Sequence, residues 1–493
     1  MVYWRKLMKT IRNTRFTILF TGLAAFMLIS CSKKVASTGG GGGGTVVTPP
    51  VTVKTDVNMW LTTPDQAQLL AKQNVSLMFN TTTNSNTTIN VDSTTTYQTI
   101  DGFGFALTGG SAQVINAMPA TQSNALIKEL FATDSTGINI SYIRVTLGAS
   151  DMSTAPFTYD DSSTPDVNLQ NFSISMETDL IPVLKKIIAL NPNIKILACP
   201  WSAPAWMKTN NNLSGGSLLP QYYSVYANYF VKYIQAMKAQ GINIDAVTPQ
   251  NEPLNAYNNP AMLEVDTAET NFIGNYLGPA FQTAGISTKI ICYDHNCDHP
   301  EYPIYVLNDA TANKYVDGSA FHLYAGDISA LTPVHTAFPN KNIYFTEQAT
   351  FSTGTFSGDL NWHVTNLIVG ATRNWSRNVI EWNLASDPNY GPHTVGGCST
   401  CQGAVTVSGS AFTRNVSYYI IAHASKFVKA GAIRIASDAS TAFPNVAFQN
   451  PDGSKVLIVL NNSSNIASFN IQYKSKLVTS TLNGGAVATY TWK

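Results

Sequence analysis

Charge is scarce in this sequence of 493 residues: only 12% of them are charged, and 30 basic residues balance 29 acidic ones. Binding to nucleic acid needs a basic patch or stripe, so this balance predicts no nucleic-acid partner. Cysteine is also rare, with six residues in the whole chain. The apolar run from Phe16 to Ile29 is shorter than the roughly 20 residues that a transmembrane helix needs, so it is not expected to span a membrane.

The N-terminal region has the features of an export signal. The basic residues that precede the apolar run are Arg5, Lys6, Lys9, Arg12 and Arg15. The run ends at residues 28–31 (Leu-Ile-Ser-Cys), which resemble the lipobox of bacterial lipoproteins. The resemblance implies a signal peptide over residues 1–30 and lipidation of Cys31. The mature chain would then be exported and anchored in the membrane of the cell envelope, at the outer membrane or the periplasmic face. A plain signal peptide is the alternative.

Residues 31–53 have the composition of a spacer. They contain an unbroken glycine run, Gly39 to Gly44, followed by the consecutive prolines Pro49 and Pro50. Such a stretch cannot form a hydrophobic core. We therefore expect a linker between the membrane and the folded part of the chain.

Residues 97–428 alternate between runs typical of buried strands and runs typical of amphipathic helices. The expected strands are 97–104, 141–145, 195–201, 246–252, 289–294, 318–324, 342–347 and 378–383. One expected helix carries Tyr226, Tyr229, Phe230, Tyr233 and Met237 on a single face, as in a helix that packs on a sheet. Eight strands with helical crossovers predict an α/β fold, a (β/α)8 TIM barrel.

The segments on either side of the barrel are rich in Thr, Val, Asn and Ser. Residues 445–449 and 455–460 read as a hairpin around a Pro-Asp-Gly turn at 451–453. We expect an accessory β-sandwich built from both chain ends, residues 54–96 and 429–493. Its expected role is to support the barrel, and sugar binding is the alternative.

Two glutamates carry the chemical prediction. Glu252 and Glu347 each follow a short apolar run of strand type. In a TIM barrel the C-terminal strand ends meet at one mouth, so these carboxylates would share a pocket. Two carboxylates in one pocket are the minimum equipment for cleaving a glycosidic bond. The same mouth would collect Arg144, Trp201, Asp294, His322, Tyr324 and Trp382.

Several motifs resemble glycoside hydrolase family 30, which includes glucosylceramidases and β-1,6-glucanases. They are, in chain order, residues 200–210, 248–253, 321–324, 345–347, 381–384 and 423–427. The resemblance implies that Glu252 is the general acid/base and Glu347 the nucleophile of a mechanism that retains the anomeric configuration. It implies no cofactor and no metal.

The two roles set further expectations. Carboxyl groups of a retaining enzyme lie about 5 Å apart, and the negative charge of Glu347 should keep Glu252 protonated by raising its pKa. By resemblance Asn251 would donate to the sugar 2-hydroxyl. Arg144 and Tyr324 would orient Glu347. The remaining sugar-binding candidates are Asp151, Trp201, Trp206, His322 and Trp382, of which Trp206, like Arg144, has simple packing or pairing as the alternative.

The sequence departs from the glucosylceramidase pattern at two places. After the first strand it reads Ala106-Leu107-Thr108 without the usual Asp, and Gln348-Ala349 follows Glu347 where Ala-Cys is more usual. We expect an exported retaining β-glycosidase that acts on β-linked glucosides and resembles glucosylceramidases. One alternative is an endo-acting β-1,6-glucanase; another is a non-catalytic sugar-binding lipoprotein. The partners are thus a β-glucoside or β-glucan and a membrane, and the oligomeric state stays undetermined.

The remaining cysteines fall in loops of the expected mouth. Cys398 and Cys401 follow the last barrel strand, and Cys292 and Cys297 flank the end of the fifth. In an exported chain one or two disulfides that stiffen these loops are expected, with a zinc site or a redox pair as alternatives. A metal could in principle be held by Asp294, His295, Asp298 and His299, but we expect that loop to line the sugar site.

Overall fold

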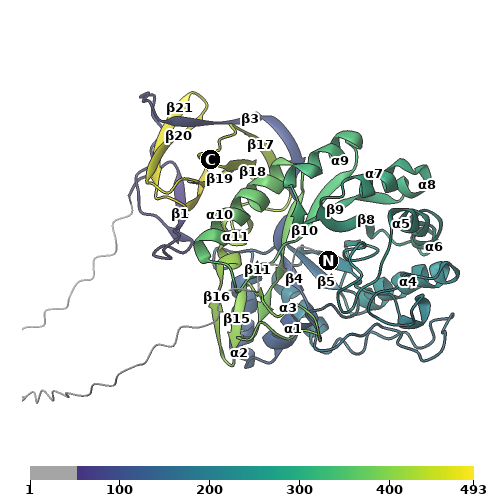
Figure 1. The fold of residues 1–493 in the computed structure, drawn as a ribbon. Helices are drawn as coiled ribbons and strands as arrows, with labels where there is room; N and C mark the ends of the chain where they lie inside the picture. Colours follow the sequence, from purple (N-terminus) through teal and green to yellow (C-terminus); the bar gives the residue numbers. More distant parts are fainter. Residues whose placement is uncertain (1–52) are drawn as a thin grey trace, which may run out of the picture. The chain divides into compact units, whose positions relative to one another are not determined.

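The computed structural model describes residues 53–493 (Figure 1). The predicted signal peptide, the lipidation site Cys31 and all of the predicted linker but its last residue lie outside the described residues. Between residues 53 and 493, no helix is long and apolar enough to cross a membrane.

Eight parallel strands form the predicted TIM barrel. They are β4 (Gly102–Leu107), β5 (Tyr142–Thr146), β6 (Lys195–Cys199), β7 (Ala246–Val247), β8 (Lys289–Cys297), β9 (Val316–Gly326), β10 (Asn342–Glu347) and β12 (Asn378–Asn383). Strands β4 to β10 pair in chain order, and β12 pairs with β4. At the remaining seam, Arg377 N donates to Ile343 O at 2.9 Å and Phe345 N donates to the Asn378 side chain at 2.9 Å.

The barrel strands are buried on both faces, which explains their nearly continuous apolar sequences. Side chains from seven strands form one buried apolar cluster; these are Tyr142, Leu197, Ala246, Ile291, Ala320, Tyr344 and Ile380. Gly104 of β4 is required by close packing, because a Cβ atom there would lie 1.8 Å from Tyr142 O on the neighbouring strand.

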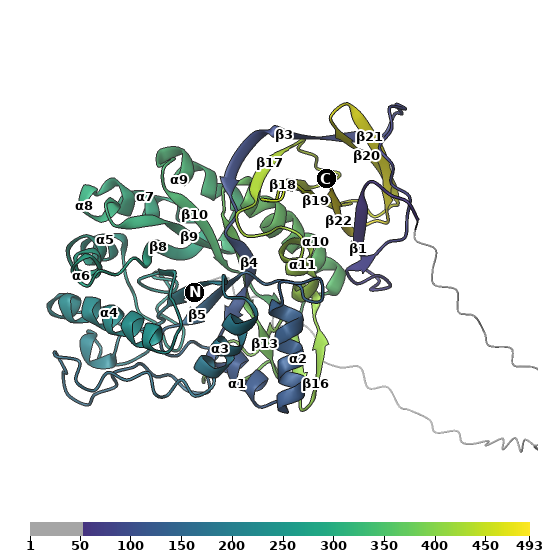
Figure 2. The ribbon, with the colours of Figure 1, turned by 180° about the vertical axis from the view of Figure 1, so that it is seen from behind.

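Helices surround the barrel on its outside (Figures 1 and 2). The main ones are α1 (Gly109–Asn116), α2 (Ala120–Phe131), α3 (Leu180–Leu190), α4 (Tyr223–Ala239), α5 (Asp266–Phe272), α6 (Gly278–Thr283), α7 (Glu301–Asn308), α9 (Leu331–Ala337), α10 (Phe356–His363) and α11 (Val416–Ser425). The predicted tyrosine face of α4 is buried in the core, as expected for a helix packed on the barrel.

Two strand predictions need correction. The first expected strand, 97–104, is divided between two sheets: its first residues end β3 (Thr87–Thr99), and the barrel strand begins at Gly102. The fourth expected strand contains only Ala246–Val247, so Glu252 lies in the loop that follows rather than at the strand end. Pro249 lacks the N–H that would continue the strand pairing. Glu347, in contrast, ends β10 as predicted.

The predicted β-sandwich is built from both chain ends. Its strands, in order of pairing, are β2 (Ala71–Lys72), β1 (Asn58–Thr62), β22 (Val487–Trp492), β19 (Lys455–Leu460), β18 (Asn445–Gln449), β17 (Ile433–Ser437), β3, β20 (Ala467–Tyr473) and β21 (Lys476–Leu482). The long strand β3 pairs with β17 through residues 91–99 and with β20 through residues 87–91, so it connects the two layers (Figures 1 and 2). The predicted hairpin is β18–β19.

Buried polar contacts fasten the sandwich to the barrel. His423 of α11 hydrogen-bonds through Nδ1 to Thr489 and through Nε2 to Thr62, each at 2.8 Å, and both threonines belong to sandwich strands. Arg373 reaches backbone and side-chain oxygens of Ser437 and Asn445. Burial lowers the pKa of His423 to about 3, so the ring is neutral and bonds both hydroxyls. These contacts join α11 and Arg373 to strands of the sandwich.

Candidate active site

A cavity of about 520 Å³ opens where the barrel strands end. Seven of the predicted site residues line it: Asp151, Trp201, Asn251, Glu252, Tyr324, Glu347 and Trp382. They come from the segments that follow β5, β6, β7, β9, β10 and β12 or from the strand ends themselves. The convergence expected of a TIM barrel therefore occurs here.

The two predicted catalytic carboxylates lie close together. One oxygen of Glu252, one of Glu347 and a ring nitrogen of His322 all lie within 4.8 Å of one another. Both glutamates are largely buried, with 9% and 6% of their surfaces exposed. A separation of about 5 Å between carboxyl groups is typical of glycosidases that retain configuration, whereas inverting enzymes hold theirs roughly 6.5–9.5 Å apart.

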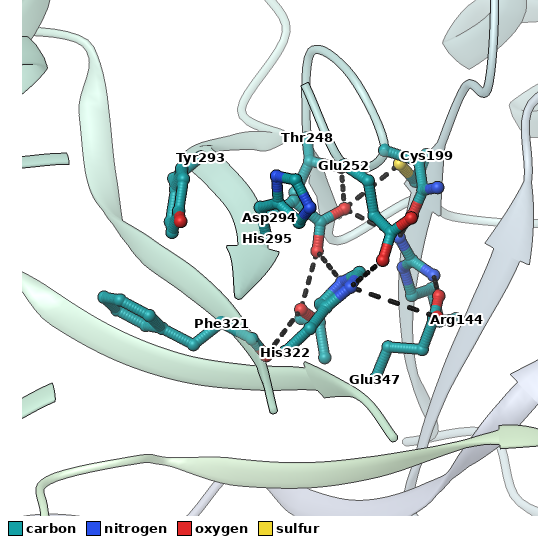
Figure 3. A network of polar contacts seen from close by, with 12 residues as sticks. Arg144, Cys199, Thr248, Glu252, Tyr293, Asp294, His295, Phe321, His322 and Glu347 are labelled. Carbon is teal, nitrogen blue, oxygen red and sulfur yellow. Dashed lines mark hydrogen bonds and ion pairs between the residues drawn. The ribbon is translucent and has the colours of Figure 1, made fainter. Parts of the chain in front are cut away.

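Asp294 is the centre of the polar network behind these carboxylates (Figure 3). It is fully buried, and five side chains donate to it. Oδ2 accepts from Arg144 at 2.7 Å, Thr248 at 2.8 Å and Cys199 at 3.1 Å; Oδ1 accepts from Thr346 at 2.6 Å and His322 at 3.1 Å. Burial alone would raise the pKa of Asp294, but the charge of Arg144 and these hydrogen bonds hold it well below its usual range. Asp294 is therefore ionised.

Glu347 is held by two groups, as the sequence predicts. Arg144 Nη1 lies 2.6 Å from Glu347 Oε2, and the Tyr324 hydroxyl donates to Oε1 at 2.9 Å. Burial raises the pKa of Glu347, while the charges of His322 and Arg144 act in the opposite direction. The carboxylate is thus fixed in orientation at both oxygens and compensated by a buried cation.

The structure contradicts the expectation that Glu252 is protonated. Burial raises the pKa of Glu252, but the hydrogen bond and charge of His322 outweigh burial and lower it to about 2. Burial lowers the pKa of His322, yet the charge of Glu347 and the bonds to Asp294 and Glu252 raise it to about 9. The proton therefore resides on His322, whose Nδ1 lies 3.4 Å from Glu252 Oε1. Only the folded arrangement places this imidazole between the carboxylates.

The backbone at the site is strained. Glu252, Tyr293 and Asp294 adopt left-handed conformations with φ of 44°, 76° and 66°. Such a conformation costs a residue with a side chain about 1–2 kcal/mol. The Glu252 N–H donates to Asp294 O at 3.1 Å, so the two strained segments are fastened together. Strain of this kind is maintained by the surrounding structure and is frequent at functional sites.

Three of the predicted sugar-binding residues do not line the cavity. Arg144 and His322 are fully buried behind the carboxylates, where they bond to protein groups. Trp206 donates its indole N–H to Asp160 O at 2.9 Å and packs edge-on against Tyr222. The structure therefore does not place His322 and Trp206 in the wall of the cavity, and it places Arg144 in its predicted contact with Glu347. Helical and strand spacing could not show which neighbour each side chain faces.

Arg144 also orients groups that do face the cavity. Its Nη2 donates to Asn251 Oδ1 at 2.7 Å, which fixes the amide so that Nδ2, a donor, remains for a ligand. The guanidinium lies 4.8 Å from the ring of Trp201 and 5.9 Å from that of Trp382. Both indoles line the cavity, although only 2% and 3% of their surfaces are exposed.

Other lining residues were not predicted individually. They include Leu254, Asn255, Asn258, Asn296 and Phe351. Asn255 Nδ2 donates to Glu252 Oε2 at 2.8 Å, so it orients the carboxylate directly. The signal available was the asparagine-rich loop that follows the Asn-Glu-Pro motif. His295, Asp298 and His299 line the cavity, in agreement with the prediction for their loop.

The cysteine predictions have mixed outcomes. Cys398 and Cys401 form a disulfide, as predicted, and both line the cavity. Cys292 and Cys297 are free and buried, so the second predicted disulfide is wrong. Both lie in β8, opposite Ser319 and Gly326 of the neighbouring strand. With a rise of about 3.3 Å per strand residue, they lie farther apart than the roughly 7 Å that a disulfide spans.

A metal ion is disfavoured at the centre of the site. In the described part of the chain, one group of three potential ligands is close enough to hold an ion: Glu252, His322 and Glu347. However, His322 is protonated and faces both Glu252 and Asp294, and Arg144 already neutralises Glu347. A cation would have to displace two positive groups from this arrangement.

Two family models match the chain. The glycosyl hydrolase family 30 TIM-barrel domain matches residues 100–428, and the glycosyl hydrolase family 30 beta sandwich domain matches residues 431–490. The first match contains every residue that lines the cavity.

Curated relatives and solved structures match over most of their lengths. The chain is 38% identical over 407 residues to the endo-1,6-beta-D-glucanase neg1 of Aspergillus fumigatus, across 77% of this chain and 81% of the relative. It is 31% identical over 428 residues to the lysosomal acid glucosylceramidase of Mus musculus, across 80% and 82%. The structure of the endo-beta1,6-glucanase BT3312 matches with a TM-score of 0.83 and 35% identity, covering 89% of this chain and 99% of that one.

The protonation of His322 can be measured directly. In NMR spectra of protein with ¹³C-labelled histidine, one imidazole among the seven should titrate near pH 9, and its signal should be missing in His322→Asn. Asp294→Asn should lower this pKa, because it removes a carboxylate that stabilises the imidazolium. Thr346→Val is the matched control, since it removes one donor to Asp294 but no charge. A wild-type His322 that titrates at or below about 6.5, the usual value, would contradict the assignment.

Proposed function

The chain belongs to glycosyl hydrolase family 30, and from this premise we propose that it cleaves β-1,6-linked glucan internally with retention of configuration, using Glu347 as nucleophile and Glu252 as general acid/base. The observation that carries the mechanism is the approach of the two carboxylates to within 4.8 Å across a cavity lined by tryptophans. Membership of the family shows that the chain is a β-glycosidase. The polymer that it cleaves and the roles of Glu252 and Glu347 are our proposal.

In the first step Glu347 attacks the anomeric carbon. A bond forms between a Glu347 oxygen and that carbon while the glycosidic C–O bond breaks. The leaving oxygen takes a proton from Glu252, which receives it from His322 across the 3.4 Å contact. After this transfer Glu252 is a carboxylate and His322 is a neutral imidazole. Arg144 and Tyr324 keep the attacking carboxylate aimed throughout.

In the second step water releases the sugar. Glu252 removes a proton from the water and returns it to His322, while the water oxygen bonds to the anomeric carbon and the ester bond to Glu347 breaks. Two displacements at one carbon leave the configuration unchanged. Asp294 stabilises the imidazolium at both ends of the cycle, because it stays ionised and bonded to Nε2.

Sequence similarity supports β-1,6-glucan as the substrate. Relatives named as endo-1,6-beta-D-glucanases are 37–38% identical to this chain, whereas relatives named as glucosylceramidases are 31–32% identical. The absence of an acidic residue at the end of β4 and just after it, over residues 106–111, also departs from the glucosylceramidase pattern. Glucosylceramide is the second candidate, because the mouse glucosylceramidase matches across four-fifths of both chains.

Variants of the two glutamates should separate their roles. Glu347→Gln should reduce turnover by about 10⁴-fold or more, because no glycosyl-enzyme can form. Glu252→Ala should lose most activity on β-1,6-glucan, yet still react with aryl glucosides whose leaving groups need no protonation. Azide should then restore its turnover and yield the β-glycosyl azide. Glu381→Gln, a buried glutamate bonded to His363 outside the cavity, is the matched control and should keep its turnover.

An α-glycosyl azide from Glu252→Ala would reverse the assignment of the two glutamates. Labelling by a 2-fluoro glycoside on a peptide without Glu347 would have the same consequence, since that reagent traps the nucleophile.

A substrate panel tests the proposed polymer. Purified protein should hydrolyse β-1,6-glucan faster than β-1,3-glucan, xylan and glucosylceramide presented in detergent. Internal cleavage should lower the mean chain length early and release oligosaccharides before glucose. Glucose as the sole early product would overturn internal cleavage, and a faster rate on glucosylceramide would favour the second candidate.

We further propose that the chain is exported and anchored by a lipid on Cys31, on the strength of the basic residues, the apolar run and the lipobox-like end at residues 28–31. Cys31→Ala should shift the protein from the membrane fraction to the soluble fraction while glycosidase activity remains, because the acyl chains supply the membrane affinity. Fractionation of cells that express either version measures this. A variant that still needs detergent for extraction would contradict lipid anchoring.

A further inference from the structure

The disulfide Cys398–Cys401 closes a turn that forms part of the cavity wall. Cys401 begins the short strand β14 (Cys401–Gln402), which pairs with β11 (Thr350–Phe351), the segment just after Glu347. Ser352 N donates to Thr400 O at 2.9 Å, and Cys401 packs in one apolar cluster with Trp201 and Trp382. The Cys401 side of the turn is therefore fixed to the sheet and to the indoles of the site.

The Cys398 side of the turn is bonded to Asp151. Cys398 N donates to Asp151 Oδ2 at 3.3 Å, and Thr394 N donates to Asp151 O at 2.7 Å. At Gly397 a Cβ atom would lie 2.5 Å from Asp151 O, so the two backbones touch. Asp151 is 7% exposed and lines the cavity beside Glu347. The backbone N–H of Cys398 thus orients a carboxyl group that faces the place of the substrate.

Apart from the disulfide, Cys398 is held by its N–H bond to Asp151 and by partial packing against the cluster of Trp201, Trp382 and Cys401. Two glycines precede it, and Gly396 has φ of 83° with no atom within 4 Å of a Cβ position. Glycine loses more conformational freedom on ordering than any other residue. Gly397 N donates to Thr394 O at 3.0 Å, so this backbone retains some restraint, but without the covalent link to Cys401 it would hold the Cys398 N–H against Asp151 less firmly.

We propose that the Cys398–Cys401 disulfide is a positioning device for Asp151 that sets the affinity of the site for sugar, so that its reduction weakens substrate binding while the chemical step persists. This inference rests on the proposed function, because it takes the cavity to be the sugar site. The two cysteines act through Asp151 and are positioning residues. When dithiothreitol reduces the disulfide, the two sulfurs gain two electrons and two protons to give two thiols, and the reagent is oxidised to a cyclic disulfide.

The kinetic test compares wild type with the double variant Cys398→Ser/Cys401→Ser, which leaves no single reactive thiol. KM for an aryl β-glucoside should rise about 10-fold in the variant, with kcat within about 3-fold, because binding is lost and the Glu252–Glu347 geometry is not. Dithiothreitol should produce the same change in wild type, and reoxidation should reverse it. The reagent should not change the variant, which retains the buried thiols Cys199, Cys292 and Cys297.

A double-mutant cycle with Asp151→Asn distinguishes positioning from general loosening. If the disulfide acts through Asp151, its removal should change KM much less in the Asp151→Asn background than in wild type. An equal rise of KM in both backgrounds, or an unchanged KM in fully reduced wild type, would overturn the proposal. A parallel loss of kcat and thermal stability would also overturn it, since it would indicate a structural role alone.

A second readout does not depend on activity. Burial, followed by the charge of Glu347, raises the pKa of Asp151 to about 7, and the hydrogen bond from Cys398 lowers it. Loss of that donor should therefore raise the pKa further, as measured by ¹³C NMR of labelled aspartate with Asp151→Asn for assignment. If the wild type hydrolysed no glycoside, the proposed function would fail, while an Asp151 pKa that rises on reduction would still support the contact. An unchanged pKa would refute it.

Discussion

The ion pair between Asp294 and Arg144 is the interaction on which the rest of the site depends. Both groups are fully buried, and their 2.7 Å contact is completed by hydrogen bonds from Thr248, Thr346, Cys199 and His322. A buried charge is tolerable only when paired and hydrogen-bonded, and breaking such a pair typically costs about 3–5 kcal/mol. Because Asp294 is negative, it can hold Arg144 and His322 as cations, and each of them holds one of the two glutamates.

This arrangement of charges determines which residue carries the catalytic proton. Three carboxylates, Glu252, Glu347 and Asp294, surround His322, and their negative charge keeps the imidazole protonated despite its burial. Two adjacent glutamates without such an imidazole would share one proton, because two adjacent carboxylates resist joint ionisation. In this structure the proton is bound to His322, which is in direct contact with Glu252. The left-handed backbone of Glu252, bonded through its N–H to Asp294 O, is part of the cost of that geometry.

Several elements could be predicted because their signal is local. The buried strands ending at Glu347 and Asn383 contain short apolar runs, at 343–345 and 379–380, and the tyrosine face of α4 follows helical spacing. The C-terminal ends of the barrel strands meet at one mouth, and seven predicted residues therefore line one cavity. Trp206 was misplaced because a tryptophan after β6 can turn inward or outward without changing the pattern. The boundary near Ile100 was missed because β3 and β4 are both strands, and only pairing partners distinguish their sheets.

The sequence by itself determined the fold class, the two catalytic candidates and the presence of Cys398 and Cys401 in one loop, since apolar periodicity and short motifs record these directly. Tertiary structure alone decided which charges meet. Asp294 lies 150 positions from Arg144 along the chain, and His322 lies 70 from Glu252. A pKa depends on the distances between such groups and on their exclusion from water. The order of residues specifies neither the distances nor the burial. Asp294 is therefore an anion and His322 a cation only because the barrel closes around them, and the same closure makes Glu252 a hydrogen-bond acceptor from His322.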